Sequence, residues 1–213
     1  MWYAAIAYSA ESMIARVDLE MFPHQSLMEM LVDGFVEKRR YHIHTNECAR
    51  DIAEWNGVNV NPQGAVIKID WRDCIRFNHF PLGGTIALQY LPSTVRKFYL
   101  TGSNMQGTVD VAGLPREMQR FHMQRNHLSG TLDLQMLGEC MIVFMVHTNR
   151  FSGSLNLTKL PHSLGSLHLH TNRFTGIVIV GVLPDSALIL LRDNPIDGVC
   201  TESGVPFSDP RIP

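Results

Sequence analysis

Apolar and polar positions in the second half of the chain repeat at a fixed interval of 23 residues. The clearest passage, residues 164–176, reads LGSLHLHTNRFTG, and the passages that begin at residues 141 and 118 keep its apolar, asparagine and glycine positions. Within each passage apolar and polar residues alternate, as they do along a β-strand with one buried face. A chain that repeats one short unit in this way is expected to wind into stacked coils. The pattern therefore predicts a solenoid with a short strand in every coil.

A glycine and an asparagine mark the register of the coils. The turn glycine recurs at Gly84, Gly107, Gly130, Gly153, Gly176 and Gly198. The asparagine position is filled by Phe80, Ser103, Asn126, Asn149, Asn172 and Asn194. An asparagine can hydrogen-bond backbone groups of its own coil and the next, which a buried turn requires. Because Phe80 cannot do this, we expect the first coil to be an atypical terminal unit.

The segment between each turn glycine and the next coil also alternates, which predicts a second short strand on the outer side. A leucine-proline step follows at Leu91-Pro92, Leu114-Pro115, Leu160-Pro161 and Leu183-Pro184, and Leu137-Gly138 is the exception. Proline stops helix growth. We therefore expect strand and turn throughout the convex side.

These strings carry a family resemblance. Asn-x-x-Ser/Thr-Gly-x followed by an aliphatic residue resembles the plant-specific type of leucine-rich repeat. With a Leu-Pro-x-x-Leu/Val step in place of the usual convex segment, the coils are most similar to the leucine-rich-repeat proteins of trypanosomatids. The resemblance covers about residues 55–198. It implies an α/β, strand-rich, right-handed horseshoe of about six 23-residue coils, and interaction or surface roles in general.

The first part of the chain is expected to cap the solenoid. Ser26 and Glu29 have the spacing of a capping box, and an amphipathic helix is predicted from there to Arg40, with its apolar face packed over the first coil. A second short helix is predicted over residues 47–55. We expect a helical segment and repeat cap at 1–71, the solenoid at 72–198 and a tail at 199–213. The apolar face consists of Leu27, Met30, Leu31 and Phe35.

The cysteines bear on the compartment. Residues 55–60 and 66–71 resemble the N-terminal cap of plant-type repeats, but Ala53 and Val60 fill the two cysteine positions of that cap, so its disulfide is absent. The four cysteines are Cys48, Cys74, Cys140 and Cys200. Their wide spacing predicts free thiols and a reducing compartment. No basic residue precedes the short apolar start, which favours the cytoplasm, with import into an organelle as the alternative.

Composition is that of an ordinary globular chain: 45% of the 213 residues are hydrophobic and 18% are charged. No apolar run approaches the roughly 18 residues of a membrane span. Side chains that flank the inward positions of each strand should point to the concave face, because side chains alternate along a strand. The residues there that we expect to contact a partner are Arg76, Tyr99, Arg120, His122, Gln124, Met145, His147, His168, His170, Leu190 and Arg192.

Charge on the concave face favours an anionic partner. Its four columns contain five basic residues against the single acid Asp193, whereas the whole chain has a formal net charge of -2. An acidic protein segment or an RNA backbone is the ligand that such a face attracts; alternatively, five such residues are ordinary surface charge. The basic residues are Arg76, Lys97, Arg120, Arg125 and Arg192. The far part of the face is apolar at Val143, Met145, Leu188 and Leu190. It is either an interface or covered by the tail.

His147 and His170 fall in the same column of neighbouring coils, about 4.8 Å apart if the strands pair normally. Two imidazoles at that distance can share a metal ion or respond to pH. A metal site needs a third ligand, and Gln124, next in the column, is a poor one. We therefore expect no metal and no other cofactor. An enzyme with a histidine-built metal site is the alternative, although none of the motifs of nucleophilic, zinc-protease or nucleotide-binding sites occurs.

These observations predict a noncatalytic protein-interaction module that binds a macromolecular partner through the concave strand face. A preformed sheet face binds with little ordering cost, which suits it to protein recognition. The alternative is a structural subunit of a large ribonucleoprotein or cytoskeletal assembly that contacts RNA or acidic protein surfaces, which the basic bias favours.

Overall fold

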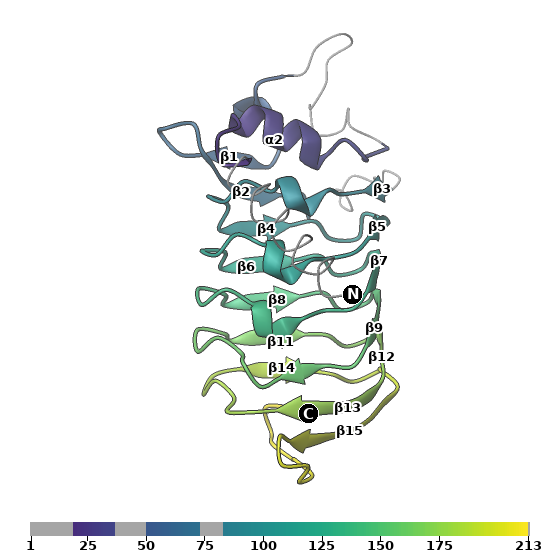
Figure 1. Ribbon diagram of the computed structural model, residues 1–213. Coiled ribbons are helices and arrows are strands. Elements are labelled where there is room, and N and C mark those ends of the chain that lie inside the picture. Colours follow the sequence, from purple (N-terminus) through teal and green to yellow (C-terminus); the bar gives the residue numbers. More distant parts are fainter. Residues whose placement is uncertain (1–18, 37–49, 73–82, 213) are drawn as a thin grey trace, which may run out of the picture.

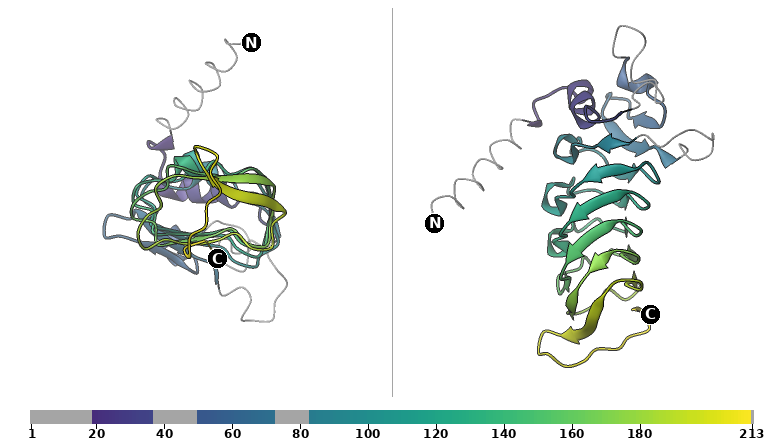
Figure 2. Two further views of the ribbon diagram at one scale, coloured as in Figure 1. Left: turned by 90° about the horizontal axis from the view of Figure 1, so that it is seen from below. Right: turned by 90° about the vertical axis from the view of Figure 1, so that its right-hand side faces the viewer.

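The computed structural model describes residues 19–36, 50–72 and 83–212. These residues form a β-solenoid whose coils stack along one axis (Figure 1). Viewed along that axis, successive coils follow nearly the same outline (Figure 2). The predicted repeat solenoid is therefore confirmed. In the part of the chain that the structure describes, no helix is both long enough and apolar enough to cross a bilayer.

One side of the solenoid is a seven-stranded sheet. Its strands, in spatial order, are β1 (Val58–Val60), β2 (Val66–Asp70), β4 (Lys97–Tyr99), β6 (Arg120–His122), β8 (Val143–Met145), β11 (Ser166–His168) and β14 (Leu188–Leu190). The hairpin of β1 and β2 is antiparallel, and every later pair is parallel and in register. From β4 onward the strands keep the predicted interval, so the columns read from the sequence are real rows of neighbours.

The first coil departs from the predicted register. The 23-residue interval places Cys74 and Arg76 beside β4, but Lys68 and Asp70 of β2 occupy those places. Cys74 and Arg76 lie outside the described residues, within 73–82. The prediction failed because β2, which alternates like the other strands, joins the sheet directly and leaves a longer interval before β4.

Two smaller sheets complete the coils. The five-stranded sheet consists of β3 (Gly84–Thr85), β5 (Met105–Gly107), β7 (His127–Gly130), β9 (Arg150–Gly153) and β12 (Arg173–Phe174), on the right in Figure 1. The three-stranded sheet consists of β10 (Asn156–Leu157), β13 (Gly176–Val180) and β15 (Ile196–Thr201). The predicted strand after the turn glycine is thus present in the later coils. The turn itself needs a left-handed backbone, as at Gly130, where φ is 88°.

Three earlier coils carry short 3-10 helices on the outer side, so the prediction of strand and turn throughout that side was wrong. These are η4 (Leu88–Tyr90), η5 (Val111–Gly113) and η6 (Leu134–Met136). The carboxylates of Asp110 and Asp133 accept hydrogen bonds from the backbone N–H two residues later, at 3.1 and 3.2 Å, and so begin a helical turn. The proline that follows η4 and η5 stops the helix from growing.

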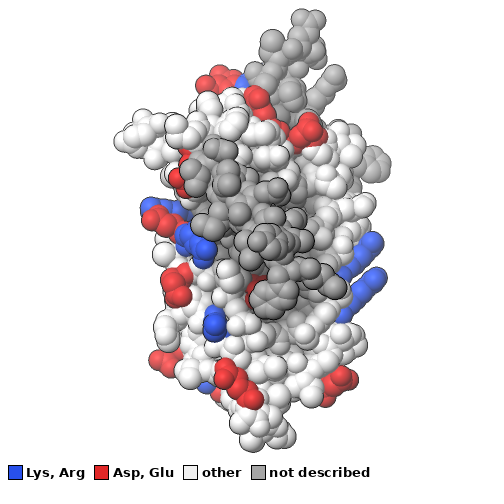
Figure 3. Space-filling view, in the orientation of Figure 1, with Lys and Arg blue, Asp and Glu red and all other residues white. Residues whose placement is uncertain are grey.

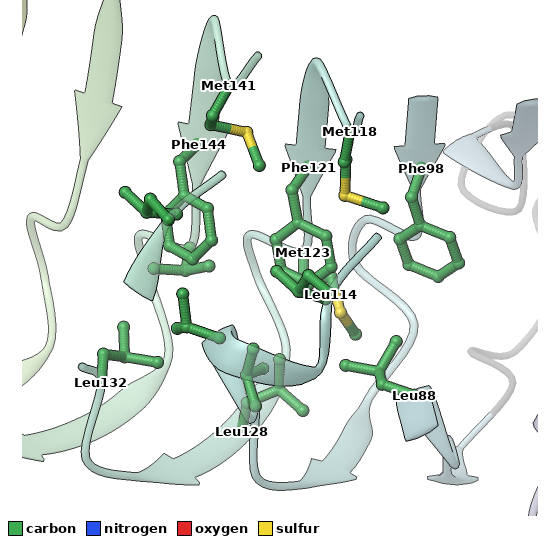
Figure 4. Packing of buried hydrophobic residues seen from close by; sticks show 14 of the residues in the cluster. Leu88, Phe98, Leu114, Met118, Phe121, Met123, Leu128, Leu132, Met141 and Phe144 are labelled. Carbon is green, nitrogen blue, oxygen red and sulfur yellow. The ribbon is translucent and has the colours of Figure 1, made fainter. Parts of the chain in front are cut away.

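The core lies between the sheets. Phe98, Phe121 and Phe144 are fully buried at the same inward position of β4, β6 and β8, with ring centroids 5.7 and 5.2 Å apart (Figure 4). Leucines from the opposite side of the coil, among them Leu88 and Leu128, pack toward these rings. Truncating a buried phenylalanine typically costs about 3–5 kcal/mol. Stacking of equivalent side chains therefore holds neighbouring coils together.

Buried asparagines join each coil to the one before it. The Asn172 carboxamide donates to the carbonyls of Leu169 in its own coil and Val146 in the preceding coil, and accepts from the N–H of Phe151. Asn126, Asn149 and Asn194 repeat this arrangement. The predicted bonding between coils is thus confirmed, but it runs to the preceding coil and not to the next. Phe80 lies outside the described residues.

The helix α2 (His24–Leu31) closes the N-terminal end of the core, as predicted. It differs from the prediction in extent, since it begins at His24 after Pro23 without a side-chain cap and ends far short of residue 40. Gly34 accounts for the early end. Its carbonyl accepts the N–H of Thr85 at 3.0 Å, and a Cβ at Gly34 would lie 2.6 Å from the Thr85 carbonyl oxygen, so the chain must pass directly against β3.

Residues 50–55 support α2. The side chain of Gln25 accepts the N–H of Ile52 and donates to the carbonyl of Arg50, at 2.8 and 3.0 Å. In place of the helix predicted over 47–55, the described part of that range contains only the 3-10 turn η2 (Ile52–Glu54), begun by the Asp51 carboxylate. This short turn and α2 together leave no apolar face of the first coil open.

The tail closes the other end. The backbone carbonyl of Arg211 accepts the N–H of Ile189 in β14 at 2.7 Å, and Phe207 and Ile212 pack against the core. The guanidinium of Arg211 also binds the carbonyls of Leu183 and Pro184. The tail therefore covers the end of the last coil and part of the edge of the seven-stranded sheet.

The asparagine contacts give a stability prediction. Asn172→Ala leaves the N–H of Phe151 and two buried carbonyls without partners, and we expect it to lower the free energy of unfolding by about 2–4 kcal/mol. Arg173→Ala, at the exposed next position, is the matched control and should change it by less than about 0.5 kcal/mol. Denaturant unfolding followed by circular dichroism measures both. Equal effects would contradict the assigned role.

Candidate functional site

The outward side chains of the six parallel strands form one surface, here called the strand face. Its first column is Lys68, Lys97, Arg120, Val143, Ser166 and Leu188, and its second is Asp70, Tyr99, His122, Met145, His168 and Leu190. A third column, just beyond the strands, is Thr101, Gln124, His147, His170 and Arg192. All the predicted contact residues except Arg76 lie on this surface.

The N-terminal end of the strand face is basic. Asp70 is held by Arg72 and Lys68, at 2.7 and 3.0 Å, and the hydrogen bond from Arg72 is the main reason that the pKa of Asp70 falls to about 2. Lys97 and Arg120 are direct neighbours in the first column, and among the described residues neither has an acidic partner within ion-pair distance. Lys68, Asp70 and Arg72 were not predicted, because the first coil was placed in the wrong register.

Tyr99 forms the floor of the basic end. Its side chain is only 7% exposed, with the Arg72 guanidinium carbon 4.3 Å from the ring centroid and the His122 ring 4.7 Å away. A cation over an aromatic face is attracted to it. A partner would therefore meet Arg72 and His122 before it met Tyr99.

Histidines occupy the middle of the strand face. The rings of His147 and His170 stack, with centroids 4.2 Å apart and an interplanar angle of 11°, and His168 lies 6.1 and 5.9 Å from them. Burial, and then the charge that His170 and His168 would add, lowers the pKa of His147 to about 4. Burial also lowers the pKa of His168 and His170, each to a smaller extent. These three imidazoles are thus uncharged near neutral pH.

His122 links the basic end to the histidines. Its pKa falls to about 4, first because the ring is buried and then because Arg72 and Arg120 lie near it, while Asp70 acts in the opposite direction. The ring is therefore also neutral at pH 7. The histidines that the sequence suggested as conditional charges add no positive charge to the strand face at that pH.

Four buried polar atoms on this surface have no hydrogen-bond partner. They are Thr101 Oγ1, His122 Nε2, Gln124 Oε1 and His170 Nδ1. Leaving such an atom unpaired costs about 1–3 kcal/mol, so buried side-chain polar atoms are usually satisfied. All the buried unpaired side-chain atoms of the described residues thus lie on one face. Thr101 was in a predicted column but was not expected to be a contact, because the alternating pattern does not reveal which atoms are left unpaired.

The C-terminal end of the strand face is apolar. Leu188 is 41% exposed, Met145 and Leu190 are half-buried, and Val143 is buried with 8% exposure. The tail crosses the end of the last coil and leaves Leu188 open to solvent. Of the two predicted alternatives for this patch, coverage by the tail is therefore wrong for Leu188.

The histidines do not form a preformed metal centre. The described residues contain no group of three or more His, Cys, Asp or Glu side chains that could hold a metal ion. The geometry of His147 and His170 explains this, because two parallel stacked rings direct their nitrogens side by side and not toward a common point. Cys140 and Cys200 are free thiols.

The lowered pKa values give a prediction of pH dependence. A histidine whose pKa is lower in the folded state favours folding above the unfolded value of about 6.5, and this stability is lost as the pH falls toward the folded value. For His122 and His147 the loss should run from about pH 6.5 to about pH 4. We expect the melting temperature to fall over that range, and His122→Gln with His147→Gln to flatten the fall.

The control for this prediction is His162→Gln, which changes an exposed histidine outside the strand face. Scanning calorimetry at several pH values should show the parent dependence in this variant. An equally steep fall in the double variant would show that burial of the two rings is not its cause.

Comparisons with known proteins support the fold. No family model matches the chain, and no curated protein sequence matches it. The Arabidopsis thaliana BIR2 ectodomain superposes with a TM-score of 0.59 and 18% identity over 86% of this chain and 97% of that one. A chain of the Arabidopsis BIR3–SERK2 complex gives 0.57 and 18% over 85% and 96%. The leucine-rich-repeat ectodomain of the Arabidopsis receptor kinase SOBIR1 gives 0.50 and 19% over 71% and 80%. The chain therefore has the fold of plant leucine-rich-repeat ectodomains, while similarity to trypanosomatid proteins stays a prediction.

Proposed function

We propose that the chain is a noncatalytic protein-interaction module whose partner rests on the strand face. The observation that carries the proposal is the set of four buried, unpaired polar atoms on that face. Each costs free energy in the unbound chain, and a partner that supplies the missing donors and acceptors recovers it. The same atoms reject a partner that cannot do so, which is a source of specificity.

The strand face is also suited to a protein by its form. Its strands are held by parallel pairing and by the phenylalanine stack beneath them, so binding would order few groups and cost little conformational entropy. An exposed leucine beside polar and basic side chains matches the mixed chemistry of protein interfaces. One of the similar structures is that of a complex of two proteins, BIR3 and SERK2, which shows the fold in such an assembly.

Site-specific photo-crosslinking tests the proposal. A photoreactive amino acid replaces Leu188 on the strand face or, as the matched control, Ile179 on β13, which is 36% exposed on another side of the solenoid. In extract of cells that express the protein, after RNase treatment, we expect a discrete protein adduct from position 188 at a yield at least about tenfold above that from 179. Comparable adducts from both positions would contradict the proposal and favour a subunit embedded in a larger assembly.

A further inference from the structure

We propose that the bound part of the partner is an extended peptide that crosses the strands along the solenoid axis, with an acidic side chain at the basic end of the strand face and an aliphatic side chain at the apolar end. This rests on the proposed function and specifies the chemistry of the partner. The argument has four parts: the unpaired cations, the exposed leucine, the row of unpaired polar atoms and the distance between the two ends.

The basic end lacks a negative charge. Lys97 and Arg120 stand side by side on β4 and β6, and like charges on neighbouring strands repel each other. The nearby carboxylate of Asp70 is already bound by Lys68 and Arg72. A carboxylate placed between Lys97 and Arg120 would relieve their repulsion. It would also lie beside His122, whose Nε2 has no partner.

The apolar end lacks a cover. Leu188 and Leu190 project from β14, and Met145 lies two strands away in the same column as Leu190. Burying a leucine-sized side chain here would contribute about 1.5–3 kcal/mol. The tail, which occupies the end of the last coil, leaves this patch free. An aliphatic side chain of the partner fits this chemistry.

The unpaired atoms between the two ends set the direction of the peptide. Thr101 follows β4, His122 and Gln124 belong to β6 and the residues after it, and His170 follows β11, so the row runs along the axis and across the strands. Backbone N–H and C=O groups of an extended segment can satisfy such a row, since Gln124 Oε1 needs a donor. Addition of a strand to the sheet edge is disfavoured, because the carbonyl of Arg211 already pairs with β14.

The distance between the ends sets the spacing of the two side chains. From β6 to β14 the sheet takes three steps, which amount to about 14 Å at about 4.8 Å per strand. An extended chain covers about 3.4 Å per residue, so the acidic and aliphatic positions should be about four residues apart. The histidines between them are neutral at pH 7, so the intervening partner residues need no charge.

Selection from a phage-displayed library of random peptides about twelve residues long tests this inference on the full chain. We expect enrichment of sequences with Asp or Glu about four positions from Leu, Ile, Val or Met. Lys97→Glu with Arg120→Glu should weaken a selected peptide by at least about tenfold and should itself select peptides with Lys or Arg at the acidic position. Leu188→Ser with Leu190→Ser should remove the preference for the aliphatic residue.

The matched control is Arg150→Glu with Arg173→Glu, at two exposed arginines on β9 and β12 of the five-stranded sheet. Figure 3 shows basic side chains that project at that edge of the molecule. This variant should bind the selected peptides as the parent does. If it loses them to the same extent, or if the enriched peptides have no paired acidic and aliphatic positions, the inference is overturned while the proposal of a strand-face partner still depends on the crosslinking result.

Single-stranded RNA is the competing ligand for the basic end. Labelled oligouridine should bind the parent chain weakly and with little dependence on Lys97 and Arg120. Tight binding that is lost in the Lys97→Glu, Arg120→Glu variant and weakens steeply with salt would overturn the peptide proposal in favour of phosphate contacts.

Discussion

The hydrogen bonds of the buried asparagines are the constraint on which the rest of the solenoid depends. Each turn after a strand places backbone groups inside the coil, where water cannot reach them. Asn172 satisfies groups in its own coil and in the preceding one with a single carboxamide, and Asn126 does the same two coils earlier. Because the amide reaches a fixed distance, each coil can stack on the one before it in only one register. The parallel pairing of the strands follows from that register.

A fixed register has consequences of opposite sign on the two sides of the seven-stranded sheet. On the inner side, repetition of one residue type is favourable, since Phe98, Phe121 and Phe144 stack ring on ring. On the outer side, the same rule brings Lys97 next to Arg120 and His147 next to His170. The chain cannot separate these pairs without shifting a whole coil. Unfavourable neighbours on the strand face are therefore maintained by favourable neighbours beneath it, which is how a rigid scaffold can present groups that a partner satisfies.

The interval of 23 residues was sufficient to predict the coils from β4 onward, because every buried position returns at the same place. It failed for the first coil, where β2 obeys the same alternation but lies 29 residues before β4, so that Arg76 was placed where Asp70 stands. It also missed the 3-10 helices, which depend on a single aspartate and not on a periodic pattern. The contact columns could be predicted from alternation alone. The unpaired atoms could not, since they depend on how deeply each neighbour covers Thr101 or His170.

Burial changes the electrostatic character of the strand face from the one that composition suggests. Counted by residue type, the face has a row of arginines and lysines to which the histidines add conditional charge along its whole length. In the folded chain, mutual burial lowers the pKa of His122 and His147 to about 4, and Asp70 offsets part of the charge of Lys68 and Arg72. Positive charge that is free to act on a partner is therefore concentrated at Lys97 and Arg120. A long polyanion would find matching charge only at this end and would leave the polar atoms and leucines beyond it unsatisfied, whereas a peptide of mixed character would match the whole length of the face.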